Sequence, residues 1–110
     1  MDEDGVIVAV GDVAAQTVRV MTNLRIALQA AEADLTDVVK TTVYVASHRR
    51  EDLQAAWGVV RRHFGDHDPP GTLLGVVVLG YPHQLVEVEV IAACAKHRPL
   101  RTSRGGSLKR

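Results

Sequence analysis

Apolar residues recur at helical spacing in two stretches of the chain, and each stretch predicts an amphipathic helix. The first covers residues 13–33 and follows Asp12, a residue type that favours the N-cap. Its apolar stripe comprises Val20, Leu24, Ala27, Leu28 and Ala31. The second ends near Gly65, a common C-terminal signal, and its stripe comprises Leu53, Ala56, Trp57, Val60 and Phe64. Each helix therefore has one face to bury against another layer.

A period of two residues indicates strands in the remaining apolar segments. Residues 38–46 are mostly β-branched, with one side made of Val39, Thr41, Val43 and Val45. Residues 72–79 are aliphatic almost throughout, and residues 85–92 alternate between a valine face and a face with Leu85, Glu87, Glu89 and Ile91. Residues 80–84 are turn-prone, so the last two strands predict a β-hairpin. The apolar piece at residues 5–11 is an edge strand or a loop.

The order helix, strand, helix, strand, strand predicts an α+β domain in which both helices cover one face of a sheet of at least three strands. Nothing in the chain covers the other face, which carries Glu87 and Glu89. A carboxylate on a sheet face needs water, a partner charge or a ligand. We therefore expect both the chemistry and an interface between copies of the chain on this face.

The composition fits one globular domain, which we place at residues 1–95, since 46% of the 110 residues are apolar. Aromatic residues make up only 4%, which argues against a base-stacking RNA platform. The formal net charge is zero, but residues 96–110 carry six basic residues and no acidic one. We predict a disordered basic tail there. Six charges without an apolar anchor would bind nucleic acid only weakly and in a salt-sensitive way.

The same sequence predicts a cytoplasmic protein without a membrane anchor. No apolar run reaches the roughly 20 residues of a membrane span, and the start of the chain lacks a signal-peptide pattern. The single cysteine, Cys94, cannot form an internal disulfide, which favours a reducing compartment. Its place at the end of an apolar strand is typical of a small buried hydrophobe.

Other candidate chemistry in the sequence is weak, and we predict neither a metal site nor a cofactor. His63 and His67 are four residues apart, as in a helical metal pair, but Gly65 interrupts the helix between them and no third ligand is suitably spaced. No glycine-rich phosphate loop is present. Cys94 and His97 do not make a nucleophile–base pair, because one lies in an apolar strand and the other in the tail.

Several motifs in the right order resemble the Rid family, the reactive-intermediate deaminases of the YjgF type. The lysine–threonine–threonine strand and the terminal strand with two alternating glutamates are the most specific, and the match runs over roughly residues 5–95. The matching segments are Gly11-Asp12, Ala15-Gln16-Thr17, Asn23-Leu24, residues 37–45, Pro69 onward, and residues 85–92. The resemblance implies a chorismate-mutase-like fold, a homotrimer and clefts between subunits. It also implies hydrolysis of enamines and imines that pyridoxal-phosphate enzymes form from amino acids.

The sequence departs from the family pattern in ways that bear on this activity. Active deaminases carry an arginine soon after the proline before the penultimate strand, and it grips the substrate carboxylate. Gly71 stands at that place, and a family asparagine of the second helix falls at Trp57. The family also has two further strands before Gly5, which supply a tyrosine and a Ser-Gly segment to the cleft. The domain therefore resembles an N-terminally truncated member, or one whose front strands lie upstream of a misassigned start.

The resemblance places a candidate site around Glu87, which falls at the first glutamate of the terminal strand. In the family this glutamate helps to hold the attacking water; the alternative is a glutamate that pairs with a neighbouring subunit. We expect Glu89 to be structural. Gly71, Thr72 and Tyr81 are the candidate substrate-binding residues, although residues at a hairpin tip such as Tyr81 and His83 are more commonly singly exposed turn residues.

Three functions remain open at this point. The first is a homotrimeric small-molecule-handling protein whose ligand is an imine, enamine or keto acid, without strong deaminase activity. The second is a deaminase that uses Glu87 and backbone groups on a substrate without a carboxylate. The third, a ribonuclease or RNA-binding role, is the weakest, because aromatic residues are few and the basic charge is confined to the tail.

Overall fold

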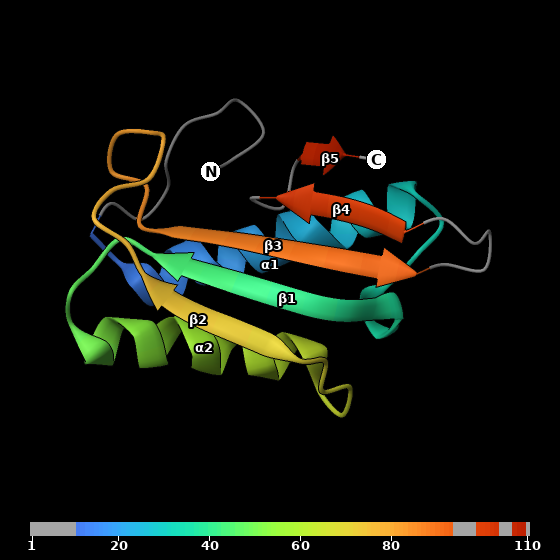
Figure 1. The fold of residues 1–110 in the computed structure, drawn as a ribbon, viewed down its shortest axis with the longest axis horizontal. Helices are drawn as coiled ribbons and strands as arrows, with labels where there is room; N and C mark the ends of the chain where they lie inside the picture. Colours follow the sequence, from blue (N-terminus) through green and yellow to red (C-terminus); the bar gives the residue numbers. More distant parts are fainter. Residues whose placement is uncertain (1–10, 94–98, 104–106, 110) are drawn as a thin grey trace.

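The computed structural model describes residues 11–93, 99–103 and 107–109. In these residues two helices lie on one face of a five-stranded mixed sheet (Figure 1), as the sequence predicted. The helices are α1 (Val13–Ala30) and α2 (Arg50–Phe64), and a short 3-10 turn, η1 (Leu35–Asp37), follows α1. The strands are β1 (Val38–Val45), β2 (Gly71–Gly75), β3 (Val86–Ala93), β4 (Pro99–Ser103) and β5 (Ser107–Lys109). Residues 5–10 of the possible first strand lie outside the described part.

The strand order is β2-β1-β3-β4-β5, so β1 lies between the two strands that the sequence paired as a hairpin. β1 runs parallel to β2, with α2 as the crossover, and antiparallel to β3. The predicted hairpin is therefore wrong. The apolar run leaves the sheet after Gly75, where β2 ends. The next residue still contacts β1, because the Val76 N–H donates to the Val45 carbonyl at 2.8 Å. The Ala46 N–H donates to the Leu85 carbonyl on the other side, also at 2.8 Å, so the end of β1 separates the two segments.

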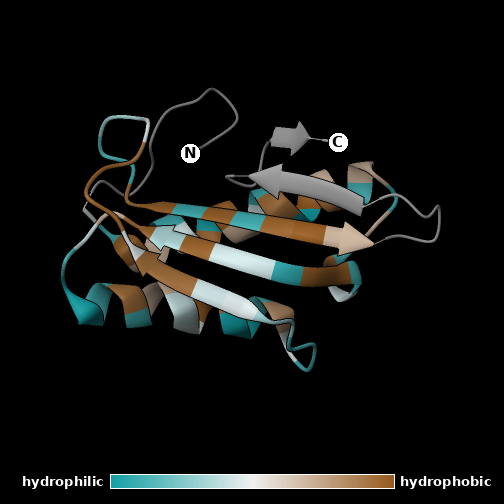
Figure 2. Cartoon of the chain, viewed as in Figure 1, coloured by the Kyte–Doolittle hydropathy of each residue, from teal (hydrophilic) through white to brown (hydrophobic). Residues whose placement is uncertain are grey.

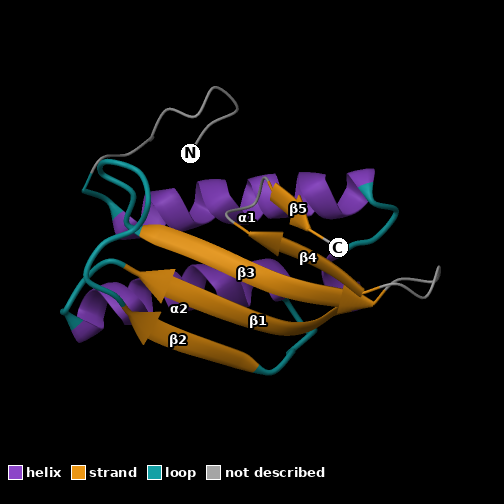
Figure 3. Cartoon of the chain, turned by 45° about the horizontal axis from the view of Figure 1, so that its top comes forward, coloured by secondary structure: helices purple, strands orange, loops and turns teal. Residues whose placement is uncertain are grey.

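Both helices lie on the same face of the sheet (Figure 3). Their apolar stripes pack onto the valine face of the sheet. Helix α1 starts where predicted, because the Asp12 carboxylate accepts a hydrogen bond from the Ala15 N–H at 2.9 Å. Helix α2 ends at Phe64, and its C-cap Gly65 has a φ of 63°, which suits glycine. The core includes Met21, Leu24 and Leu28 of α1, Ala56, Val60 and Phe64 of α2, and Val43, Val45, Val86, Val88 and Val90 of the sheet. No helix in the described residues is both long and apolar enough to cross a bilayer.

The alternation of β3 is visible in Figure 2, where hydrophobic and hydrophilic residues succeed one another along the strand. Val86, Val88, Val90 and Ala92 are buried, while Glu87, Glu89 and Ile91 lie on the face without helices. In β1 the expected alternation fails at one end, because a bulge separates the Val38 and Lys40 pairings. Val39 is consequently 51% exposed instead of buried, and Val38 takes its place in the core.

The turn η1 between α1 and β1 is fixed by a reciprocal cap. The Asp34 carboxylate accepts hydrogen bonds from the hydroxyl and the backbone N–H of Thr36, and the Asp34 N–H donates to the Asp37 carboxylate at 3.0 Å. The bond from the Thr36 hydroxyl, followed by that from its backbone N–H, holds the pKa of Asp34 below its usual value. This cap sets the point at which β1 begins.

The end of the chain differs from the disordered tail that its charge predicted. β4 pairs antiparallel with β3 along Glu89 to Ala93, and β5 pairs antiparallel with β4. On the side of β3 that faces away from β1, backbone N–H and C=O groups pair with β4, as an unpaired strand edge favours. The prediction of a disordered tail was based on charge alone and did not take account of this backbone pairing.

Candidate functional site

A row of polar side chains crosses β1 and β3 on the face that the helices leave open. Tyr44 lies opposite Glu87 in the antiparallel register, and Thr42 lies opposite Glu89. All four residues are half-buried in the single chain. Directly opposite residues have Cβ atoms about 4.5–5.5 Å apart, so each carboxylate has a hydroxyl-bearing neighbour. The two glutamates therefore share one face, as their spacing indicated.

Gly71, in contrast, lies on the helix-facing side of the sheet. It pairs with Thr41, which is buried beneath the helices. A Cβ atom added at Gly71 would lie 2.5 Å from Cη2 of Trp57 and 3.1 Å from Cγ2 of Thr41. The indole thus fills the space that any side chain at this position would need. Within one chain, Gly71 and Glu87 lie on opposite faces of the sheet.

A second glycine repeats this arrangement at the other end of β2. A Cβ atom at Gly75 would lie 2.8 Å from the Ser47 carbonyl oxygen and 3.6 Å from Cδ1 of Leu53. Leu53 and Trp57 are one helical turn apart on α2, so the helix sets one large side chain over each glycine. The two glycines allow α2 to lie close against the edge strand of the sheet.

The other two candidate residues take different positions. Thr72 is exposed and pairs with Thr42, so it shares the open face with the two glutamates. Tyr81 is 41% exposed and lies in the connection between β2 and β3. The structure thus brings Thr72 and Glu87 to one face, places Gly71 beneath it, and leaves Tyr81 beyond the end of the strands.

Gln16 anchors the connection that carries Tyr81. The sequence analysis did not predict Gln16 as a site residue. Its side-chain Nε2 donates to the His83 carbonyl at 3.0 Å, and its Oε1 accepts from the Leu85 N–H at 2.9 Å. Gln16 is only 2% exposed. Gln84 adds a hydrogen bond from the Tyr81 N–H at 3.2 Å. The sequence carried a signal for this anchoring role. Gln16 lies four residues before Val20, within the apolar stripe of α1, where a polar side chain requires a partner.

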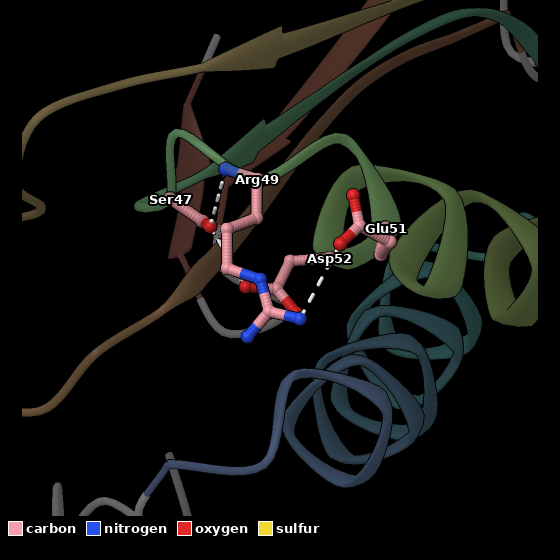
Figure 4. A network of polar contacts seen from close by, with 4 residues as sticks. All are labelled: Ser47, Arg49, Glu51 and Asp52. Carbon is pink, nitrogen blue, oxygen red and sulfur yellow. Dashed lines mark hydrogen bonds and ion pairs between the residues drawn. The ribbon is translucent and has the colours of Figure 1, made fainter.

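A cavity of about 860 Å³ opens at the carboxyl ends of β1 and β2, beside the first turn of α2. Its lining comprises Ala46, Ser47, His48, Arg50, Glu51, Leu53, Gly75, Val76 and Val77, and includes none of the candidate site residues. Its polar wall is ordered by a small network (Figure 4). The Ser47 hydroxyl donates to Asp52 at 2.7 Å, and Arg49 pairs with Glu51 at 3.4 Å.

Two histidines, His63 and His67, bind backbone carbonyl groups through their rings. A ring nitrogen of His63, Nδ1, lies 2.9 Å from the Val59 carbonyl oxygen, and Nε2 of His67 lies 2.7 Å from that of Val38. Each short distance places an N–H on the ring nitrogen that faces the carbonyl. No group of three or more metal-ligating side chains gathers anywhere in the described ranges. Cys94 and His97 lie outside them.

Residues 1–94 match the model of the family described as endoribonuclease L-PSP. A RutC family protein of Pyrococcus abyssi is 38% identical over 83 residues, which cover 74% of this chain and 62% of that protein. The chain therefore spans less than two thirds of the length of this relative.

Two solved structures agree in both sequence and fold. A member of the YjgF/YER057c/UK114 family from Mycobacterium tuberculosis is 37% identical with a TM-score of 0.68, over 74% of this chain and 67% of that one. The Rid family protein YyfB from Yersinia pestis is 32% identical with a TM-score of 0.74, over 83% and 69%. Together with two helices packed on one face of a mixed sheet, these matches show that the chain belongs to the Rid family, also called the YjgF or L-PSP family.

Proposed function

We propose that this chain is a homotrimeric, small-molecule-handling member of the Rid family that lacks strong activity on imines of ordinary amino acids. The observation that carries the proposal is Gly71, which has no side chain and whose Cβ position lies within 2.5 Å of the Trp57 indole. A carboxylate is held best by a guanidinium that donates two parallel hydrogen bonds. Neither Gly71 nor Trp57 can provide this group. The ligand we propose is a neutral imine, enamine or ketone, and the proposed location is the cytoplasm.

The positions of Gly71 and Glu87 on different faces of the sheet support an oligomer. Gly71 and Glu87 lie on opposite faces within one chain, so a cleft that uses both positions requires a second copy. Within the part of the chain that the structure describes, no helix lies over the open face with Glu87 and Glu89. In addition, Val77 is 98% exposed and Val78 74% exposed directly after the edge strand. Apolar side chains so exposed are typical of surfaces that another chain covers.

Deamination of freshly generated 2-aminoacrylate should be close to the uncatalysed rate. A substrate without a carboxylate clamp loses the orientation that makes attack by water effectively unimolecular. A general base contributes about 10²- to 10⁴-fold when it is positioned on its substrate, and Glu87 would act on a substrate that is poorly placed. Ammonia release is to be measured for the wild type and for Glu87→Gln. Rapid release by the wild type that Glu87→Gln abolishes would refute the proposed lack of activity and favour the deaminase alternative.

That alternative, hydrolysis of an imine without a carboxylate, has one observation in its favour. Glu87 is a half-buried carboxylate directly opposite Tyr44, on the open face that also carries Thr42 and Thr72. A carboxylate in such surroundings can hold and activate a water molecule. A ribonuclease function has no comparable support in the described residues, because His63 and His67 both bind backbone carbonyls. RNA retention that disappears with rising salt would test it.

Val77→Asp should dissociate the oligomer. The wild type is expected to sediment as three copies of 11.9 kDa, about 36 kDa. Burying an unpaired carboxylate at each interface costs several kcal/mol, so the variant should need at least about 10-fold more protein to assemble. Ile26→Asp is the matched control, because Ile26 is a 59% exposed apolar residue on α1, in the layer that we leave outside the interface. A wild type that stays monomeric at high concentration would contradict the proposal.

A further inference from the structure

We infer that the cavity at the carboxyl ends of β1 and β2 binds a small aliphatic carboxylate, which the Arg50 guanidinium holds by its charge. The cavity lies at the opposite end of β2 from Gly71, and its lining includes none of the candidate site residues. The inference therefore goes beyond the proposed function and does not depend on it. It assigns a binding site and no reaction.

The strand ends that bound the cavity are fixed by backbone hydrogen bonds. The Ala46 N–H donates to the Leu85 carbonyl, and the Val76 N–H donates to the Val45 carbonyl, both at 2.8 Å. The volume of about 860 Å³ lies within the roughly 300–1,000 Å³ that is typical of small-molecule sites. Because these walls are already held in place, a ligand has little of the chain to order when it binds.

The connection between β1 and α2 is fixed by one side chain. The Ser47 hydroxyl accepts a hydrogen bond from the Arg49 N–H at 3.0 Å and donates one to the Asp52 carboxylate at 2.7 Å (Figure 4). This pair of bonds sets the position from which α2 begins, and with it the place of Arg50. It also holds the Asp52 carboxylate against Ser47, and Asp52 is not one of the residues that line the cavity.

The charged groups that line the cavity favour an anion. His48 and Arg50 belong to the lining, and neither side chain has a hydrogen bond or ion pair with another described residue. Glu51 is the only acidic residue of the described lining, and its carboxylate is paired with the Arg49 guanidinium at 3.4 Å. A guanidinium can donate two parallel hydrogen bonds to a carboxylate. Arg50 therefore offers the group that an anionic ligand requires.

The remaining part of the described lining is apolar and favours a ligand with a short aliphatic chain. Leu53 and Val76 are half-buried there, whereas Val77 is 98% exposed and so lies at the mouth. Each methylene group that leaves water against such a wall strengthens binding by about 4-fold. The proposed function places Val77 against a second copy of the chain, so we assign the aliphatic contact to Leu53 and Val76.

Three probes separate the charge of the ligand from its aliphatic chain: 3-methylbutanoate, acetate and 3-methylbutan-1-ol. Calorimetry at neutral pH should show that 3-methylbutanoate binds about 10-fold or more tightly than either of the others. Acetate lacks the branched chain, and the alcohol lacks the charge. In ¹⁵N-labelled protein, 3-methylbutanoate should shift the amide resonances of Ser47, Gly75 and Val76 most, and leave that of Gly71 in place.

Arg50→Gln should weaken 3-methylbutanoate by about 10-fold or more and leave the affinity for the alcohol unchanged. Arg50→Lys keeps the charge but loses the two parallel hydrogen bonds, so its affinity should be intermediate. Arg62→Gln is the matched control, because Arg62 is exposed on the same helix and lies outside the lining. Since Arg50 is exposed as well, its variants should fold like the wild type.

The inference is overturned if acetate or the alcohol binds as tightly as 3-methylbutanoate, or if Arg50→Gln leaves the affinity unchanged. Stronger binding of 3-methylbutan-1-amine would also refute it, because the site would then select a cation through Glu51. So would amide shifts centred on Gly71 and Glu87. Failure of the proposed function shows differently, as a monomeric wild type or as rapid ammonia release from 2-aminoacrylate.

Discussion

Gln16→Leu should lower the free energy of unfolding by about 2–4 kcal/mol, since each buried polar group left unpaired costs about 1–3 kcal/mol. Leucine fills a similar volume but cannot donate to the His83 carbonyl or accept from the Leu85 N–H. The side chain of Gln16 is 2% exposed, so water cannot replace its bonds without opening the structure. The exposed position of His83 keeps the estimate below the sum for two fully buried groups.

Urea denaturation followed by circular dichroism measures this loss. Gln29→Leu is the control, because Gln29 is an exposed glutamine on the same helix and should change stability by less than about 0.5 kcal/mol. If the two variants were equally stable, the hydrogen bonds from Gln16 would contribute nothing, and another contact would have to hold the connection in place.

Gly71→Arg should also destabilise the fold, by about 1–3 kcal/mol, as is usual for a side chain forced into filled space. Its Cβ would meet Cη2 of Trp57 at 2.5 Å, so the indole must leave its position. Combining Gly71→Arg with Trp57→Ala should recover part of the loss, because the smaller residue frees the space. A thermodynamic cycle over the four proteins should therefore give a coupling energy above about 0.5 kcal/mol.

Strictly additive effects would show that the two side chains do not compete for the same space. Ala55→Arg serves as the control for the added charge, because Ala55 is exposed on the same helix and its replacement should be nearly neutral. The cycle also has a practical consequence. Adding an arginine alone cannot test for a carboxylate clamp at this position, because the single variant disturbs the packing of α2.

Local patterns predicted most of the elements. The 3.6-residue period located both helices, Asp12 and Gly65 marked one end of each, and the alternation of residues 85–92 correctly placed Glu87 and Glu89 together. These features depend only on neighbours along the chain. Helix α1 nevertheless ends three residues early, at Ala30, where the chain turns through Glu32 with a φ of 61°.

Pairing between strands that are distant in the sequence could not be predicted from these local patterns. The aliphatic run at residues 72–79 carries no signal for its partner, so the insertion of β1 between β2 and β3 could not be foreseen. The same limitation hid the contact between Gly71 and Trp57, which depends on the register of β2 against β1 and on the path of the α2 crossover. Sequence comparison placed the two residues at separate family positions without showing that one excludes a side chain at the other.

The central place of β1 also determines when the sheet can form during synthesis. β1 ends at Val45, and its antiparallel partner begins at Val86. A ribosome adds about 5–20 residues per second, so roughly 40 residues correspond to about 2–8 seconds. Throughout that interval a β-branched segment is available to the wrong partner. Lys40 is the only charged residue of the strand, and its positive charge is the sole electrostatic barrier that β1 itself offers against pairing with a nascent copy of the same chain.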